Sequence, residues 1–470
     1  MKHNILFIVT DDQKYQTIHA IDNPDIITPN LDKLVTSGSY FDNAYIPGGY
    51  VGAVCMPSRA MINSGRNLCE LWGNGEKIPE EHITLAESLR NNGYYTYGTG
   101  KWHNGTEAFT RGFCSGDNIF FGGMWDHWNV PVCDYDPTGK YDNEIDFVMD
   151  FHTSKTPSGV PSRVHCDKFN PGVHSTQMVT NTVVDFINSY EDSKPFYVYS
   201  AYLAPHDPRT MPQKYLDLYD MDKLNLPPNV CDNHFEYGVS TARDEQLGDL
   251  PRNEKAIRKE LRSYYAMITH LDDEIGRIIT ALKEKGEYDN TIIVLCGDNG
   301  LAVGQHGLMG KQSCYEHSLK IPLLVAGPNI PKQRVQQNVF LMDIYPTLMD
   351  ICGFETPDSV TSKSFYKALI GEEFKGREQM YGLFKDLVRS YRDGDYKIIE
   401  FANVTRRTML FNIKNDPYET CDLSENAEYK EMLVQMREKL IANSKIYENE
   451  DNFMAKNYWD AYNLADQKCL

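Results

Sequence analysis

Two short apolar runs that end in acidic side chains are the feature of this 470-residue chain that most constrains its fold. Residues 4–9 read Asn-Ile-Leu-Phe-Ile-Val, and residues 291–296 read Thr-Ile-Ile-Val-Leu-Cys. Unbroken apolar runs of this length are typical of strands that are buried on both faces of an α/β sheet. Each run is followed within three residues by oxygen-bearing side chains, which are Asp11, Asp12, Asp298 and Asn299.

The chain alternates between strand-like and helix-like segments through most of its length. Residues 84–92 are predicted to form a helix that leads to a strand at Tyr94, and residues 196–201 form another buried strand. Apolar side chains at three-four spacing over residues 261–282 predict a long amphipathic helix that ends at Gly286. We therefore predict an α/β fold with a large, mostly parallel sheet sandwiched by helices.

The acidic pairs follow predicted strands, and ligands bind at the carboxyl ends of strands in open α/β sheets. One Asp-Asp or Asp-Asn pair alone is usually a helix cap or a turn. Two such pairs at strand ends favour a hard divalent cation, and the set of three carboxylates and one amide suits Ca²⁺ ahead of Mg²⁺. No Cys/His spacing for zinc accompanies them.

Cys55-Met56-Pro57-Ser58-Arg59 places a thiol, a turn-forming proline and a fixed positive charge within five residues. A C-x-P-x-R pattern also occurs by chance in long proteins, and a lone cysteine is more often a small buried hydrophobe. Lysines and histidines gather in three later segments, which contain Lys101 with His103, His206, and His306 with Lys311. Glycines flank two of these segments, where backbone can approach a ligand closely.

Taken in order from residue 4 to residue 312, these motifs resemble those of the type I sulfatases of the alkaline phosphatase superfamily, and in particular bacterial glycan sulfatases. The resemblance implies an alkaline phosphatase-like fold. It implies that Cys55 is oxidised to formylglycine by a formylglycine-generating or anaerobic sulfatase-maturing enzyme. It also implies that the modified residue binds the metal with Asp11, Asp12, Asp298 and Asn299.

The same resemblance implies roles for the remaining charged residues. Arg59 would stabilise the hydrated aldehyde, Lys101 would brace it, and His103 would act as the base that releases sulfate. His206 and Lys311 would bind the sulfate and protonate or stabilise the leaving oxygen.

Two further histidines are candidates for substrate binding. His127 lies in an aromatic stretch whose side chains suit a sugar, and packing of the loop is an equal alternative. His306 is either a second acid, a substrate contact or part of a turn, and Gln305 stands beside it where related sulfatases often have aspartate.

The composition argues against some classes of binding partner. With 66 acidic against 47 basic residues, the chain is a poor partner for nucleic acid or an anionic membrane. The 11 cysteines are an odd number without a framework spacing and indicate reduced thiols. No signal-peptide core or membrane span is evident, so we expect a cytoplasmic protein, or a periplasmic one if a leader was removed.

Two domains are predicted, a catalytic domain over residues 1–370 and a subdomain over residues 371–470 with antiparallel strands near residues 391–401 and 408–412 and a helix over 427–445. Such a small antiparallel ending is common in sulfatases. Residues 107–175 are rich in aromatic residues, Gly, Asp and Pro, and are predicted to form ordered loops over the active-site edge.

The function predicted from these features is hydrolysis of sulfate esters, with small O-sulfated sugars such as glycosaminoglycan fragments as substrates. The alternative is a phosphonate monoester or phosphodiester hydrolase of the same superfamily. A metal-independent binding protein is the non-enzymatic alternative, but it would not be expected to keep the nucleophile, the cations and four metal positions together.

Overall fold

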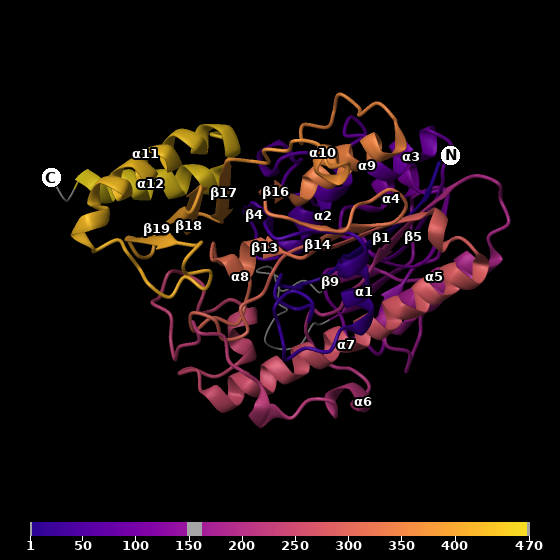
Figure 1. The fold of residues 1–470 in the computed structure, drawn as a ribbon, viewed down its shortest axis with the longest axis horizontal. Helices are drawn as coiled ribbons and strands as arrows, with labels where there is room; N and C mark the ends of the chain where they lie inside the picture. The colour runs from indigo at the N-terminus through magenta and orange to yellow at the C-terminus, as the bar shows by residue number, and fades with distance from the viewer. Residues whose placement is uncertain (1, 148–161, 468–470) are drawn as a thin grey trace.

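The computed structural model describes residues 2–147 and 162–467, and its centre is an eight-stranded sheet (Figure 1). In spatial order the strands are β15 (Gln333–Val335), β2 (Ser39–Phe41), β14 (Leu323–Ala326), β12 (Thr291–Gly297), β1 (Asn4–Thr10), β11 (Phe196–Ala201), β5 (Tyr95–Lys101) and β6 (Ser115–Phe120). The five strands from β12 to β6 run parallel, and β14 is antiparallel to both of its neighbours. The mostly parallel sheet is thus confirmed.

Strand β1 shows why the sheet must be covered on both faces. Ile5, Phe7 and Val9 belong to one buried apolar cluster, whereas Leu6 and Ile8 belong to another. The first cluster is completed by α2 (Cys55–Ser64), α3 (Leu85–Asn91) and α9 (Ile344–Cys352), and the second by α1 (Pro29–Ser37), α5 (Ser175–Ser189) and α7 (Glu254–Lys285). Figure 1 shows these two groups of helices on opposite sides of the sheet.

The long helix α7 confirms the prediction from the apolar spacing, and it begins about two turns before the predicted residues. The side chain of Asn253 accepts a hydrogen bond from the Ala256 N–H and caps the helix start. Gly286 ends it with φ of 79°, the left-handed conformation that glycine adopts most easily. The short turn η4 (Tyr288–Asn290) then leads directly into β12.

Residues 107–175 contain more regular structure than the predicted loops. They include most of α4 (Thr106–Gly112), the edge strand β6, and the short strands β7 (Pro131–Val132), β8 (Glu144–Phe147), β9 (Ser162–His165) and β10 (Lys168–Phe169). The prediction was wrong at β6 because an edge strand is half exposed and therefore carries Ser, Gly, Asp and Asn rather than an apolar run. The part of this prediction over residues 148–161 lies outside the described residues.

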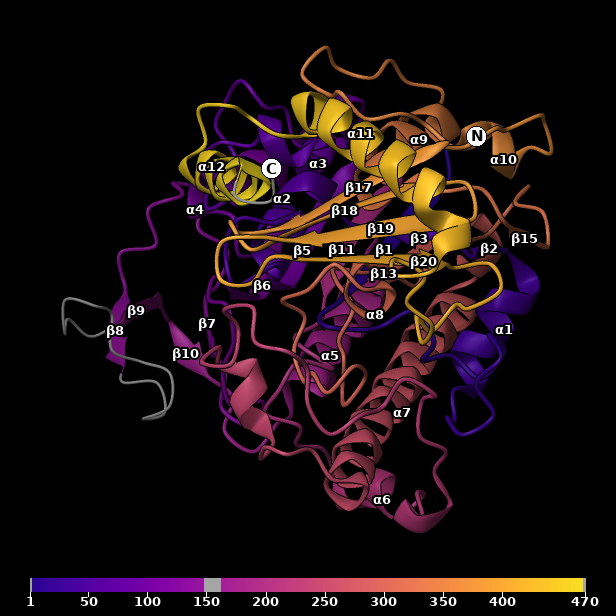
Figure 2. The same ribbon diagram turned by 90° about the vertical axis from the view of Figure 1, so that its left-hand side faces the viewer.

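The last hundred residues form a second sheet (Figure 2). Strands β17 (Gln379–Phe384), β18 (Val388–Asp393), β19 (Tyr396–Phe401) and β20 (Arg407–Asn412) are antiparallel, and α11 (Lys430–Tyr447) packs on them, followed by α12 (Phe453–Gln467). A short strand from the N-terminal part, β4 (Gly48–Gly49), pairs parallel with β17 and completes this sheet. The domain boundary at residue 371 stays a prediction.

The remaining elements are short connections: β3 (Ala44–Tyr45), β13 (Lys320–Ile321), β16 (Val339–Phe340), α6 (Gln213–Leu216), α8 (Glu316–Leu319), α10 (Tyr366–Leu369), η1 (Leu68–Glu70), η2 (Met221–Lys223), η3 (Asp244–Leu247), η5 (Leu341–Asp343) and η6 (Ala427–Tyr429). Among the helices of the described residues, none combines the length and the apolar character that crossing a membrane requires.

A buried ion pair anchors the C-terminal helices to the second sheet. Glu448, just after α11, accepts hydrogen bonds from Arg389 Nε at 2.9 Å and Arg389 Nη2 at 2.7 Å. The hydroxyls of Tyr50 and Tyr381 and the indole N–H of Trp459 also donate to this carboxylate. Arg389 is fully buried, so its charge depends on Glu448 for compensation.

Replacing Glu448 by Ala should therefore destabilise the protein by about 3–5 kcal/mol, the usual cost of leaving one member of a buried ion pair alone. Equilibrium unfolding in urea measures the effect. The matched control is Glu450→Ala, because Glu450 is exposed and two residues away. Equal unfolding midpoints for the two variants would contradict this account.

Candidate active site

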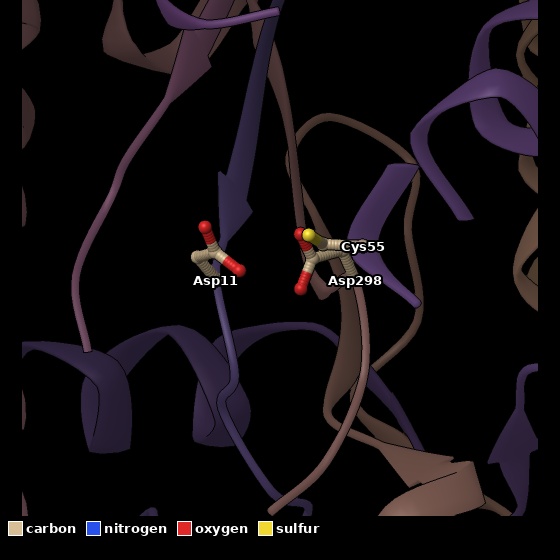
Figure 3. A group of neighbouring side chains, drawn as sticks. All are labelled: Asp11, Cys55 and Asp298. Atoms are coloured by element: carbon tan, nitrogen blue, oxygen red, sulfur yellow. The ribbon is translucent and has the colours of Figure 1, made fainter. Parts of the chain in front are cut away.

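The predicted acidic residues meet at the carboxyl end of the main sheet. Strands β1 and β12 are neighbours in register, with Thr10 opposite Gly297, so Asp11 and Asp298 follow side by side. Helix α2 begins at Cys55 and brings its thiol to the same point (Figure 3). Ligand atoms of Asp11, Cys55 and Asp298 all lie within 4.8 Å of one another, as do those of Asp11, Asp12 and His206.

Buried oxygen atoms without hydrogen-bond partners mark this place as suited to a cation. Asp11 Oδ1, Asp12 Oδ2 and Asn299 Oδ1 are all buried and accept no hydrogen bond. Such atoms are costly to bury unless something compensates them. Burial and the nearby Asp11 carboxylate raise the pKa of Asp298 to about 6. Oxygen ligands crowded in this way fit a hard divalent cation, which would satisfy the free oxygens and relieve the repulsion.

Three buried cations surround the acids. The ammonium of Lys101 pairs with Asp11 and donates to Cys55 Sγ at 3.4 Å. Lys311 pairs with Asp12. Although burial alone would raise it, the pKa of Asp11 is far below its ordinary value because Lys101, His206 and Arg59 stabilise the charged form.

All three guanidinium nitrogens of Arg59 donate hydrogen bonds to neighbouring parts of the site. Nε donates to Asp298 Oδ2 at 2.8 Å, Nη1 to the carbonyl of Lys101 at 2.6 Å, and Nη2 to the carbonyl of Tyr202 at 3.3 Å. These bonds join α2, β5 and the loop after β11. In this arrangement Arg59 holds neighbouring groups in place, and its expected role in stabilising the hydrated aldehyde at position 55 stays a prediction.

The Cys55 thiol is only 2 % exposed, and burial raises its pKa to about 11 although Lys101 and Lys311 act in the opposite direction. A thiol with this pKa stays protonated at neutral pH and is a poor nucleophile. His103 Nδ1 lies 3.6 Å from the sulfur. Burial, with the charges of Lys101 and Arg59, lowers the pKa of His103 well below its ordinary value, so its ring is neutral.

A bulge at the end of β5 places Lys101 and His103. The register between β5 and β6 shifts at Gly98/Gly100, and Gly100 has φ of 81°. A Cβ atom at Gly100 would lie 1.8 Å from the carbonyl oxygen of Ala201, so only glycine fits this close strand contact.

A cavity of about 560 Å³ opens above these groups. The predicted residues on its wall are Cys55, His103, His206 and Lys311. Met124, Trp125 and Arg163 also line it and belong to residues 107–175, which were predicted to lie over the active-site edge. The sequence analysis missed four further wall residues, because no recognisable motif marks them: Arg243, Asp244, Phe384 and Lys385.

The two predicted substrate-binding histidines do not line the cavity. His127 is fully buried, and its ring nitrogens contact Ser175 Oγ at 2.6 Å and the carbonyl of His206 at 2.9 Å. It supports the His206 backbone from behind. The ring of His306 stacks on Tyr315 with centroids 4.0 Å apart, and burial lowers its pKa to about 3. The structure thus shows packing contacts for both side chains, and their role in substrate binding stays a prediction.

Comparison with known proteins identifies the family to which this chain belongs. The family model described as Sulfatase matches residues 3–354, and the model of the N-sulphoglucosamine sulphohydrolase C-terminal region matches residues 304–446. A sulfatase of Formosa agariphila is 26 % identical over 97 % of this chain and 90 % of its own length. An arylsulfatase of Clostridium perfringens is 28 % identical over 94 % of each chain.

The fold has a matching relative among solved structures. A protein solved in complex with its substrate D-glucosamine-2-N,6-O-disulfate superimposes with a TM-score of 0.75 at 22 % identity, covering 97 % of this chain and 99 % of the other. The family model spans most of the chain and includes every residue of the acidic cluster, Cys55 and the surrounding cations. The chain therefore belongs to the sulfatase family, the sulfuric ester hydrolases of the alkaline phosphatase superfamily.

Proposed function

We propose that this enzyme hydrolyses sulfate esters of small sugars, with Cys55 in its oxidised formylglycine form and Ca²⁺ as the bound cation. The observation that carries the proposal is the set of partnerless buried oxygens of Asp11, Asp12 and Asn299 beside Cys55. The protonated, buried thiol supports the modification, because in this environment cysteine itself is a weak nucleophile.

Asp11, Asp12, Asp298 and Asn299 would hold the cation, and the group at position 55 would complete its shell. When bound, the cation supplies Lewis-acid stabilisation of negative oxygen, and the hydrated aldehyde supplies a nucleophilic hydroxyl with a second hydroxyl for release. Conversion would depend on a maturation enzyme of the formylglycine-generating or anaerobic type.

Two side chains beside position 55 have separate roles in the reaction. Lys101, 3.4 Å from Cys55 Sγ, orients the group at position 55 and offsets its charge. His103 is neutral and 3.6 Å from the same atom, so it can accept the proton whose loss releases sulfate.

His206 and Lys311 bind the sulfate from the cavity side. The ring Nδ1 of His206 donates to the carbonyl of Asp207 at 2.7 Å, which fixes the ring and leaves Nε2 near Asp12, at 3.6 Å from Oδ2. From this position His206 would deliver a proton to the leaving oxygen. Lys311, which pairs with Asp12, adds a fixed positive charge beside it.

A sugar substrate is supported by the cavity and by the relative bound to a disulfated glucosamine. A cavity of about 560 Å³ is large enough for a small saccharide, and the aromatic residue Trp125 lies on its wall.

The modification can be tested directly. Protein produced in a host with a maturation enzyme should carry the aldehyde at position 55, seen by mass spectrometry of the peptide, and turnover of 4-nitrophenyl sulfate should scale with the modified fraction. Cys55→Ala is the inactive control. Full activity in a preparation that contains only the unmodified thiol would overturn the assignment.

The metal is tested with Asp298→Asn, which removes one charge from the oxygen cluster while keeping the shape of the side chain. Metal content measured by plasma mass spectrometry and turnover should both fall, because a neutral amide is the weaker ligand. Asp350→Asn, an exposed change on α9, is the matched control. Full metal content with full turnover in Asp298→Asn would refute the site.

Sulfate should be preferred over phosphate esters. We expect kcat/KM for 4-nitrophenyl sulfate to exceed that for 4-nitrophenyl phosphate and for bis(4-nitrophenyl) phosphate on the same batch. Lys311→Ala should lose roughly 10²-fold or more, the scale of a lost electrostatic contact in the transition state. Preference for the phosphodiester would instead favour the phosphonate or phosphodiester hydrolase.

A further inference from the structure

We propose that Lys385, at the tip of the β17–β18 hairpin, binds a second anionic group on the substrate, so that the preferred substrates carry a carboxylate or another sulfate besides the ester that is cleaved. The inference rests on the proposed function and adds a specificity-determining residue to it. Lys385 and its neighbour Phe384 line the same cavity as Cys55 and Lys311.

The backbone of Lys385 is held firmly in place. Its N–H donates to the carbonyl of Gly49 at 2.9 Å, and its own carbonyl accepts from Arg389 Nη1 at 2.7 Å. Arg389 is in turn fixed by the buried Glu448. The tip of the hairpin is therefore tied both to the strand that leads toward Cys55 and to the C-terminal helices.

Close approach of the two chain segments requires glycine on the other side. Gly48 has φ of 87°, and a Cβ atom there would lie 2.0 Å from the carbonyl oxygen of Leu383. Lys385 itself has φ of 46°, a left-handed conformation in which lysine is uncommon and glycine would be the easiest residue. A lysine in this position therefore carries a backbone cost that glycine would avoid.

Lys385 differs from the other positively charged residues on the cavity wall in its ion pairing. Lys311 pairs with Asp12, Arg163 with Asp146, and Arg243 with Asp207 and Asp244. Of the lysines and arginines on the cavity wall, Lys385 alone forms no ion pair with any carboxylate in residues 2–147 and 162–467. Its ammonium lies 5.6 Å from the centroid of the Phe384 ring.

A half-buried ammonium without a carboxylate is notable in a chain whose formal net charge is −19. The sulfate being cleaved is already served by Lys311 and His206, so Lys385 offers a second, separate positive position. A charge-assisted hydrogen bond to a carboxylate or sulfate there would be stronger than one to a sugar hydroxyl.

The test compares sugars as competitive inhibitors of 4-nitrophenyl sulfate turnover by the full-length modified enzyme. The probes are N-acetylglucosamine 6-sulfate, with one anionic group, glucosamine N,6-disulfate, with two sulfates, and a monosulfated unsaturated uronate disaccharide, with a sulfate and a carboxylate. We expect at least one doubly anionic sugar to inhibit about 10-fold or more tightly than the singly charged one, as a charged hydrogen bond implies. Of the two doubly anionic sugars, the one that inhibits more tightly shows whether the second group is a sulfate or a carboxylate.

Lys385→Met should abolish this difference, and Lys385→Arg should retain most of it. Lys332→Met is the matched control, because Lys332 is exposed, lies outside the cavity and changes the net charge equally. Absence of a preference in the wild type, or a preference that survives Lys385→Met, would overturn the proposal, and an equal loss for all three sugars would make Lys385 a purely structural residue.

A failure of the proposed function would look different. In that case the modified enzyme would not hydrolyse 4-nitrophenyl sulfate at all. Calorimetric titration of the same three sugars into wild type and Lys385→Met would then still report whether Lys385 binds a second anionic group.

Discussion

The site depends on concentrating negative charge in a place from which water is excluded. Asp11, Asp12 and Asp298 are all buried at the carboxyl end of two adjacent parallel strands. Charges of one sign cannot be buried together unless cations compensate them. Arg59, Lys101 and Lys311 provide that compensation from three separate segments. The main sheet, the start of α2 and the loop before α8 must all be in place before the cluster can exist.

In this arrangement the residues that position other groups are distinct from the residues that would contact the substrate. The three guanidinium nitrogens of Arg59 donate to Asp298 and to two backbone carbonyls, and His127 holds the backbone of His206. Both residues are buried and lie behind the groups that face the cavity. Lys101 and His103 approach the Cys55 sulfur, and His103, His206 and Lys311 line the cavity. The geometry thus provides an inner layer that positions and an outer layer that meets the ligand.

The sequence predicted the parts of the fold whose signal is local. The apolar runs of β1 and β12 and the three-four spacing of α7 each follow from burial of a few consecutive residues. Strand β6 escaped prediction because half of its surface is exposed, which makes its composition resemble that of a loop.

In the candidate site, too, only features with a local sequence signal could be predicted. Motifs located Cys55 and the acidic cluster, because their residue types are themselves informative. They could not show that His127 and His306 are occupied by packing, since this depends on Ser175 and Tyr315, which are distant or uninformative in the sequence. Lys385 was missed for a related reason: only the pairing of β4 with β17 brings it to the cavity.

That pairing also sets an order of events during synthesis. Gly48 and Gly49 lie opposite Leu383 and Phe384 in the sheet, and these two residues leave the ribosome much later. At the usual rate of translation the delay is on the order of tens of seconds. Throughout this interval Phe384 and Lys385 are not yet made, so the cavity beside Cys55 lacks the part of its wall that these two residues provide in the finished protein.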